Sequence, residues 1–124
     1  HTATIDINPL NEAQQAAFDA IKVGEPICTI DQAARRVIEK AGYGPYFNHR
    51  VGHGIGLSIH EAPSVDGKNQ NLILPGMYHS VEPGIYIPGE FGMRIEDDAY
   101  ATEHGPLILS EGMRRDLDYM VLPF

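Results

Sequence analysis

The sequence predicts an α+β domain in which two helices come first and an antiparallel sheet second. Up to residue 41, apolar residues recur every three or four positions, which is the spacing of one helix face. After Gly44 the chain changes to short alternating runs separated by glycine and proline, a pattern typical of strands and turns. Segregated helices and antiparallel strands define the α+β class. A chain of 124 residues suffices for one core of this kind but not for two separate domains.

A leader and one amphipathic helix account for the first 24 residues. Residues 1–9 alternate loosely and predict a short strand or a leader without regular structure. The first helix is expected over residues 10–24, with Asn11 and Gln14 placed as N-cap and N3 residue and Gly24 closing the run. Its buried stripe comprises Leu10, Ala13, Ala16, Ala17, Ala20 and Ile21.

A second amphipathic helix is expected from Thr29 onward. Thr29 and Gln32 form a capping-box pattern at its start, and Gly42 and Gly44 end it. Its apolar stripe, expected to face the core, comprises Ile30, Ala33, Ala34, Val37, Ile38 and Ala41. The opposite face is expected to carry the charged residues Asp31, Arg35, Arg36, Glu39 and Lys40.

Strands are expected at residues 57–60, 77–82, 85–87, 93–102 and 107–109, with an exposed loop at 66–71 and a turn at 103–106. Side-chain parity then sorts their faces. Arg94 and Glu96 share one face and look into the same space, whereas His79 points away from the face of Glu82 and is a poor ligand candidate. Because Pro83 lacks an N–H group, the ladder should break directly after Glu82, a common setting for a functional side chain.

Charge and cysteine content exclude several function classes. Asp and Glu outnumber Lys and Arg by 17 to 9, and a formal net charge of −8 gives no electrostatic reason to bind phosphate backbones or anionic lipid. Nucleic acid and membrane surfaces are therefore not expected as partners. The single cysteine, Cys28, cannot form an internal disulfide, and no signal-like or spanning apolar run occurs, which favours a cytoplasmic location.

The residues that carry chemistry gather between positions 49 and 98. This stretch places imidazoles, carboxylates and a guanidinium among glycines and apolar residues, a combination that suits a metal site better than a core. Gly52, Gly54 and Gly56 bracket His53 and leave its imidazole uncrowded. Carboxylates combined with one imidazole suit borderline-hard divalent ions such as Mn²⁺ and Co²⁺.

Three ordered blocks in this stretch resemble the C-terminal part of the pita-bread metallopeptidases, specifically prolidase and aminopeptidase P. The blocks are Gly-His-Gly-Ile-Gly-Leu followed by His-Glu, then Val-Glu-Pro-Gly-Ile-Tyr, then Arg-Ile-Glu-Asp-Asp. Their spacing agrees as well, with 29 residues from His53 to Glu82 and 14 from Glu82 to Glu96. The resemblance implies that residues 10–124 form the second half of a pita-bread fold, two amphipathic helices followed by a curved antiparallel sheet, and that residues 1–9 form a leader outside it.

The resemblance also implies an activity, the metal-dependent hydrolysis of the bond between an N-terminal residue and proline in a dipeptide or longer peptide. Two divalent ions, Mn²⁺ or Co²⁺ with Zn²⁺ as a further option, would serve the complete enzyme. The residues that match the family by position are His53, Glu82 and Glu96 as metal ligands, His49 and His60 as substrate-binding residues, and His60 and Arg94 as catalytic residues.

One departure from the family bears on activity. Its two further aspartate ligands lie upstream of the helix that matches residues 10–24, and Asp6 alone does not replace such a pair. Three donors suffice for at most weak binding of one ion, so we expect this chain alone to be an incomplete peptidase. The apolar surfaces that pack on the missing half would then be exposed, which predicts a homo-oligomer or association with that half.

Other interpretations stay open at this point. Arg94 could act only as a counter-charge to Glu96 or Asp97, and His49 and His60 could serve local hydrogen bonding. The function could instead be that of a non-catalytic pita-bread module that binds a peptide or partner, or that of a metal-free, creatinase-like hydrolase.

Overall fold

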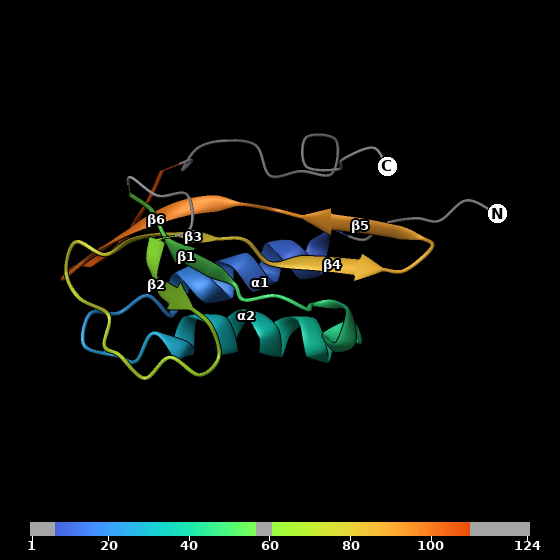
Figure 1. The fold of residues 1–124 in the computed structure, drawn as a ribbon, viewed down its shortest axis with the longest axis horizontal. Helices are drawn as coiled ribbons and strands as arrows, with labels where there is room; N and C mark the ends of the chain where they lie inside the picture. Colours follow the sequence, from blue (N-terminus) through green and yellow to red (C-terminus); the bar gives the residue numbers. More distant parts are fainter. Residues whose placement is uncertain (1–6, 57–60, 110–124) are drawn as a thin grey trace.

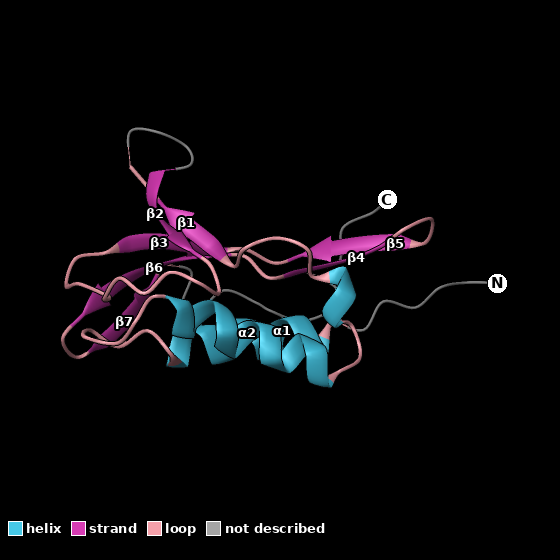
Figure 2. Ribbon diagram, turned by 60° about the horizontal axis from the view of Figure 1, so that its bottom comes forward, coloured by secondary structure: helices cyan, strands magenta, loops and turns pink. Residues whose placement is uncertain are grey.

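The computed structural model of the chain describes residues 7–56 and 61–109, which form two helices packed against one face of an antiparallel sheet (Figures 1 and 2). The α+β prediction, with helices first and antiparallel strands second, is confirmed. The elements are α1 (Asn8–Asp19), α2 (Cys28–Lys40), the 3-10 turn η1 (Gly44–Tyr46), β1 (Gly52–Gly54), β2 (Glu61–Val65), β3 (Tyr78–Val81), β4 (Gly84–Ile87), β5 (Phe91–Arg94), β6 (Asp97–Thr102) and β7 (Gly105–Ile108).

The start of α1 differs from the prediction. The helix begins at Asn8, with Pro9 in its first turn, where the missing N–H group of proline costs no hydrogen bond. Asn11 and Gln14 therefore lie inside the helix, and their predicted capping roles are wrong. Gln14 is buried instead, and its amide donates to the carbonyl of Val81 at 3.2 Å, which ties the helix to the sheet.

The start of α2 also differs. The predicted capping box does not form, because α2 begins at Cys28 and Thr29 already lies in its first turn. The Thr29 hydroxyl donates to the carbonyl of Pro26 at 2.7 Å, and the Gln32 amide donates to the carbonyl of Gly67 at 3.1 Å. At the other end the prediction is confirmed. Gly42 follows the helix with a φ of 92°, the left-handed conformation that commonly ends a helix.

Asp31 corrects the predicted outer face of α2. The helical pattern placed it among solvent-facing charges, but its side chain is completely buried. Residues 47–51 cross the helix here, and the N–H group of Val51 donates to Oδ2 of Asp31 at 2.9 Å. Periodicity does not reveal such a contact, because the covering segment comes from a part of the chain without a regular repeat.

The five-stranded sheet has the order β2-β1-β3-β6-β7, and every neighbouring pair is antiparallel. Strands β4 and β5 form a separate hairpin that continues from the ends of β3 and β6 (Figure 1). The predicted strand at 93–102 is thus divided into β5 and β6, β1 and β2 were not predicted, and the predicted strand at 57–60 lies outside the described residues.

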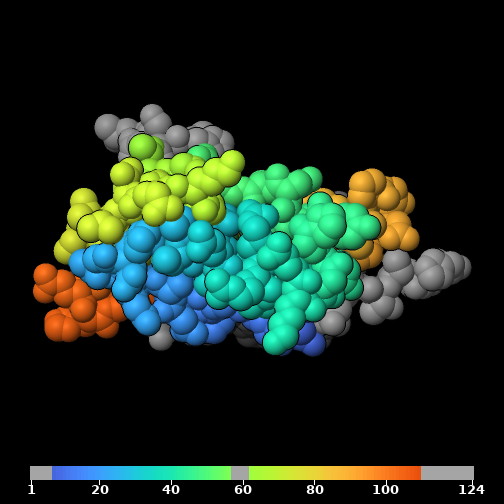
Figure 3. All heavy atoms as spheres, turned by 90° about the horizontal axis from the view of Figure 1, so that it is seen from below, coloured from blue at the N-terminus to red at the C-terminus, as the bar shows by residue number. Residues whose placement is uncertain are grey.

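The core lies between the helices and the sheet. Figure 3, viewed from the helical side, shows α1 and α2 covering the middle of this face, with β7 and the β4–β5 hairpin emerging at opposite ends. The fully buried residues include much of the predicted stripes together with sheet residues, namely Leu10, Ala13, Ala17, Ile30, Ala34, Ile38, Val65, Val81, Met93 and Ala99. Among the described residues, no helix has both the length and the apolar character needed to cross a bilayer.

Candidate active site

Strand β3 pairs with β6, and β4, which follows β3 along the chain, pairs with β5, which precedes β6. The gap between β3 and β4 lies opposite the gap between β5 and β6, so the hydrogen-bond ladder is interrupted at the same level on both sides. Within the break, Pro83 has no N–H group to donate. Pairing ends at Val81, one residue before the predicted end at Glu82. On the opposite strand the break contains Glu96, so both glutamates leave the ladder at one place. The flanking strand pairs are Val81 with Asp97 and Gly84 with Arg94.

His53 and Glu82 meet at this break. Nε2 of His53 lies 3.4 Å from Oε2 of Glu82. Nδ1 of His53 lies 2.9 Å from the carbonyl of Gly54, which can only accept, so Nδ1 carries a proton and donates it. The Ser80 hydroxyl accepts from the N–H group of His53 at 3.1 Å. Metal-binding histidines share this arrangement, in which a backbone carbonyl fixes the tautomer and directs the other nitrogen at the ion.

The carboxylate of Glu82 is largely buried, with 14% of the side chain exposed. Its Oε1 lies 3.8 Å from a terminal nitrogen of Arg94. Among the described residues, its Oε2 has no hydrogen-bond partner. A buried carboxylate oxygen without a hydrogen bond is costly, and beside an imidazole it fits direct bonding to a divalent cation.

Two further carboxylates surround this pair. Partial burial of its carboxylate raises the pKa of Glu96, the charge of Glu82 raises it further, and Arg94 opposes both effects. Burial likewise raises the pKa of Asp98, while a hydrogen bond from the Tyr78 hydroxyl, 3.3 Å from Oδ2, opposes the rise. These carboxylates disfavour one another's ionisation, a situation that a bound cation would relieve.

His49 lies beside the base of the β4–β5 hairpin. Its Nδ1 donates to the carbonyl of Arg50 at 2.7 Å, and its ring centre lies 5.0 Å from that of Phe47 and 5.6 Å from that of Tyr86. Its Nε2 is buried and has no partner within the described part of the chain. A Cβ at Gly84 would lie 2.8 Å from the Tyr86 hydroxyl and 3.0 Å from this nitrogen, so glycine permits close packing of His49 against the hairpin base.

The structure brings part of the predicted site together. His53, Glu82 and Arg94 lie together, and Glu96 is close enough to interact electrostatically with all three. Arg94 and Glu96 are both exposed, as a shared face requires. His60 lies outside the described residues. Within 7–56 and 61–109, no three acidic, histidine or cysteine side chains stand at the mutual distances of a metal site.

Two residues near the site were not predicted to act there. Asp98 interacts electrostatically with Glu82 and His53, and its parity with Glu96 was the sequence signal. Tyr86 lies against His49 and interacts electrostatically with Arg94. No spacing rule would have singled out Tyr86, because its contacts depend on how the hairpin crosses residues 47–49.

His79 belongs to the core, as its parity predicted. It is completely buried, and its Nδ1 donates to the carbonyl of Ser80 at 2.9 Å. Burial lowers the pKa of His79, and the nearby His53 lowers it further, against the effect of the Ser80 hydrogen bond. The folded chain therefore takes up a proton at His79 less readily than the unfolded chain does.

His79→Phe is expected to reduce the loss of stability in acid. Because the folded-state pKa lies below the ordinary value of 6.5, the contribution of His79 is present above pH 6.5 and is lost as the pH falls toward the lowered pKa. Urea denaturation at about pH 7.5 and about pH 5.5 measures this change. The exposed His104, replaced by glutamine, is the control and should leave the decline intact. An undiminished decline in His79→Phe would contradict the assignment.

Comparison with known proteins decides the family. The model of metallopeptidase family M24 matches residues 5–103. This chain belongs to metallopeptidase family M24. The M24 chain is 49% identical over 100 residues to a putative dipeptidase, YkvY, of Bacillus subtilis strain 168, a match that covers 81% of this chain and 28% of the relative.

Solved structures agree. The M24 chain is similar to an Xaa-Pro dipeptidase from Bacillus anthracis (44% identity, TM-score 0.82, 87% of this chain and 30% of that chain). It is also similar to an X-Pro aminopeptidase from Thermotoga maritima MSB8 (40% identity, TM-score 0.81, 86% and 30%). The predicted resemblance to the C-terminal half of a pita-bread metallopeptidase is confirmed, and the chain spans less than a third of the length of these relatives.

Proposed function

We propose that this M24 chain supplies part of a dinuclear metal site that hydrolyses the peptide bond between an N-terminal residue and proline. The observation that carries the proposal is the meeting of His53 with Glu82 at the ladder break, where the buried Oε2 of Glu82 faces the imidazole without a hydrogen bond in the described part of the chain. The printed names of similar proteins, an Xaa-Pro dipeptidase and an X-Pro aminopeptidase, support the substrate class.

In this proposal His53, Glu82 and Glu96 hold metal. One imidazole and two carboxylates suit Mn²⁺ or Co²⁺, and Zn²⁺ accepts the same donors. The chemistry that two bound ions supply is activation of a bridging water and polarisation of the scissile carbonyl. Arg94, beside Oε1 of Glu82, balances the negative charge of the ligand carboxylates and limits their freedom to turn away.

The substrate side of the proposal rests on two histidines. The partnerless Nε2 of His49 faces the hairpin base, where it would contact the bound peptide. His60 is assigned by its position in the family pattern to proton transfer at the scissile bond and to stabilising the developing oxyanion. A cytoplasmic location belongs to the same proposal.

We propose further that the chain is inactive without the upstream residues that its relatives carry. Two bridged ions need more carboxylate donors than His53, Glu82 and Glu96 provide, and these three support at most weak binding of one ion. "Complete enzyme" below denotes this chain joined to those upstream residues, with residues 10–124 as the second half of its catalytic domain.

Titration of Mn²⁺ or Co²⁺ into the chain and into the complete enzyme, with an Xaa-Pro dipeptide assay of both, tests the proposal. We expect metal-dependent cleavage by the complete enzyme only, and weak uptake of one ion by the chain alone. Absence of metal uptake by both forms would refute the proposal. Cleavage that persists after exhaustive chelation would instead favour a metal-free hydrolase, and uptake without cleavage would favour a peptide-binding module.

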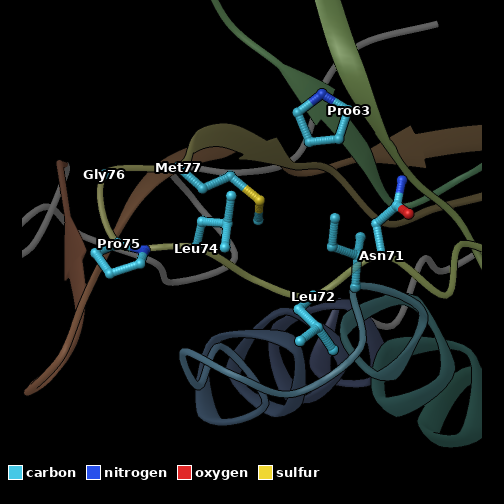
Figure 4. A pocket seen from close by; sticks show the side chains of 8 residues that line it. Pro63, Asn71, Leu72, Leu74, Pro75, Gly76 and Met77 are labelled. Atoms are coloured by element: carbon cyan, nitrogen blue, oxygen red, sulfur yellow. The ribbon is translucent and has the colours of Figure 1, made fainter.

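Exposed apolar side chains support the expectation that the isolated chain associates. Leu72 and Leu74 are 53% and 63% exposed beside an open hollow of about 570 Å³, which Pro63 and Met77 also line (Figure 4). A second group lies on and next to the edge strand β7 and comprises Tyr100, Leu107 and Leu109. Surfaces of this kind drive association in water.

We therefore expect a second copy of the chain to cover these surfaces in solution. Sedimentation velocity should show a dimer or larger species, and the double variant Leu74→Gln with Leu107→Gln should shift it toward the monomer. The charge-neutral control Gln15→Asn lies on the exposed side of α1 and should leave the distribution unchanged. A compact monomer of the unsubstituted chain at high concentration would contradict the expectation.

A further inference from the structure

An ion pair on α2, between the buried Asp31 and the partly exposed Arg35, holds the segment that carries His49. The fully buried Asp31 engages Arg35 through both carboxylate oxygens, at 2.9 and 3.2 Å. The guanidinium also donates to two backbone carbonyls, that of Phe47 at 2.8 Å and that of His49 at 2.8 Å. Its central carbon lies 4.1 Å from the ring centre of Phe47. One side chain therefore holds both carbonyls that flank residue 48.

The Asp31 carboxylate is also connected to Glu82, the proposed metal ligand, through the backbone of Val51. The N–H group of Val51 donates to Oδ2 of Asp31 at 2.9 Å. The carbonyl of Val51 accepts from the N–H group of Glu82 at 2.6 Å. Because Val51 is completely buried, its peptide groups have no room to shift independently of their neighbours. Asp31 is thus connected to the backbone of the glutamate that faces His53.

The energetics of the pair favour a role in geometry over one in stability. An exposed pair four residues apart on a helix contributes a few tenths of a kcal/mol through the helix itself. Here Asp31 is buried, so the cost of desolvating the charges offsets much of their attraction. The hydrogen bonds that remain go to residues 47–51 rather than to α2, and their effect is to define where that segment lies.

We propose that Asp31 and Arg35 are positioning residues of the active site, with Arg35 setting the position of His49 and Asp31 that of Glu82. The inference rests on the proposed function, because His49 and Glu82 are the residues assigned there to substrate and metal. Neither the Asp31 nor the Arg35 side chain is assigned to contact the substrate or the metal.

Arg35→Lys in the complete enzyme tests whether Arg35 positions His49, the proposed substrate-binding residue. Lysine keeps the charge opposite Asp31, but one ammonium group cannot hold a carboxylate and two separate carbonyls in a fixed fork. We expect KM for an Xaa-Pro dipeptide to rise about tenfold with kcat changed by less than about twofold, because His49 is displaced and the ligand carboxylates are not. Arg36→Lys, on the exposed side of the same helix, is the matched control and should change neither constant.

Asp31→Asn in the complete enzyme tests whether Asp31 positions Glu82, the proposed metal ligand. Asparagine keeps the volume, and an oxygen at the Oδ2 position could still accept from Arg35 and from the N–H group of Val51. Its NH₂ group would then replace Oδ1, and this donor would face the Nε–H donor of Arg35. We expect Mn²⁺ affinity to fall about tenfold, the size of effect seen when residues that orient metal ligands are replaced. If this variant does not fold, Arg35→Lys still decides the proposal, because the Arg35 side chain is 31% exposed and its replacement buries no unpaired charge.

The pair can be tested even if the complete enzyme cleaves no Xaa-Pro peptide, an outcome that would refute the proposed function alone. In the isolated chain, Arg35→Lys should shift the NMR signals of the His49 ring, and Asp31→Asn should speed hydrogen exchange at the Glu82 amide. The exposed His104 ring should be unaffected by either substitution. A lowered thermal midpoint with unchanged KM, metal affinity and His49 signals would show a purely structural pair and overturn the proposal.

Discussion

Glu82→Gln in the complete enzyme is expected to lower kcat/KM by about a thousandfold or more while leaving the fold intact. Glutamine has nearly the same shape, and its backbone N–H group can still donate to the carbonyl of Val51. The amide carries no negative charge, however, and it presents only one oxygen where the carboxylate presents two, to His53 on one side and Arg94 on the other. Metal content measured on the purified variant should fall together with activity.

Glu90→Gln is the matched control for this substitution. Glu90 is an exposed residue in the turn between β4 and β5, at the far end of their hairpin from the ladder break. Its replacement therefore removes the same charge from the chain without changing the break. Metal content and kcat/KM should both match the unsubstituted enzyme. If Glu82→Gln behaved like this control, the assignment of Glu82 as a ligand would be wrong.

Gly52→Ala should destabilise the chain by about 3 kcal/mol or more, or prevent folding. A Cβ at this position would lie 2.0 Å from the carbonyl oxygen of Ser80 and 2.8 Å from its carbon. Both are backbone atoms of β3, so β1 would have to move away from β3. That movement would break the pairing of Gly54 with His79 and the contact between the Ser80 hydroxyl and the N–H group of His53.

Gly24→Ala is the control for this steric effect, because it changes a glycine with a left-handed backbone conformation that has no neighbouring atoms to clash with. Gly24 has a φ of 94°, but no heavy atom lies within 4 Å of a Cβ built on it. Its replacement should cost about 1 kcal/mol, from backbone conformation alone. Urea denaturation compares the two variants at equal protein concentration. Similar losses for both would show that the strands β1 and β3 can separate without penalty.

The parts of the fold that the sequence predicted are those governed by local periodicity. The stripes through Leu10 and Ile30 are buried, Gly42 ends α2, and the strands around residues 78–81 and 84–87 lie close to their expected bounds. The predictions were wrong where tertiary contacts determine the start of a helix or the burial of a side chain. Thr29 does not cap because α2 begins at Cys28 and Thr29 already lies in its first turn, and Asp31 is buried because residues 47–51 cover it.

The candidate site was predictable to a similar extent. Parity placed Arg94 with Glu96, and the missing N–H group of Pro83 located the break to within one residue, since pairing ends at Val81 rather than at Glu82. The second break, before β6, was not predicted, because the prediction places residues 93–102 in one strand although three consecutive acidic residues, Glu96, Asp97 and Asp98, interrupt the alternation. Contacts across the fold, such as the one between His49 and Tyr86, follow from the packing of distant segments and have no signature in either segment alone.

The hairpin formed by β4 and β5 has its functional residues at the base and only the exposed residues 88–90 at the tip. Its register is counted from the pair Gly84 and Arg94, next to the break, so added residues would extend the tip without moving the base. Insertions of an even number of residues, shared equally between the strands, keep every side chain on its face, whereas a single residue added within one strand would turn the side chains between it and the tip to the other face unless a bulge absorbed it. Family members can therefore vary the distance along the chain between the two glutamates while conserving their distance in space.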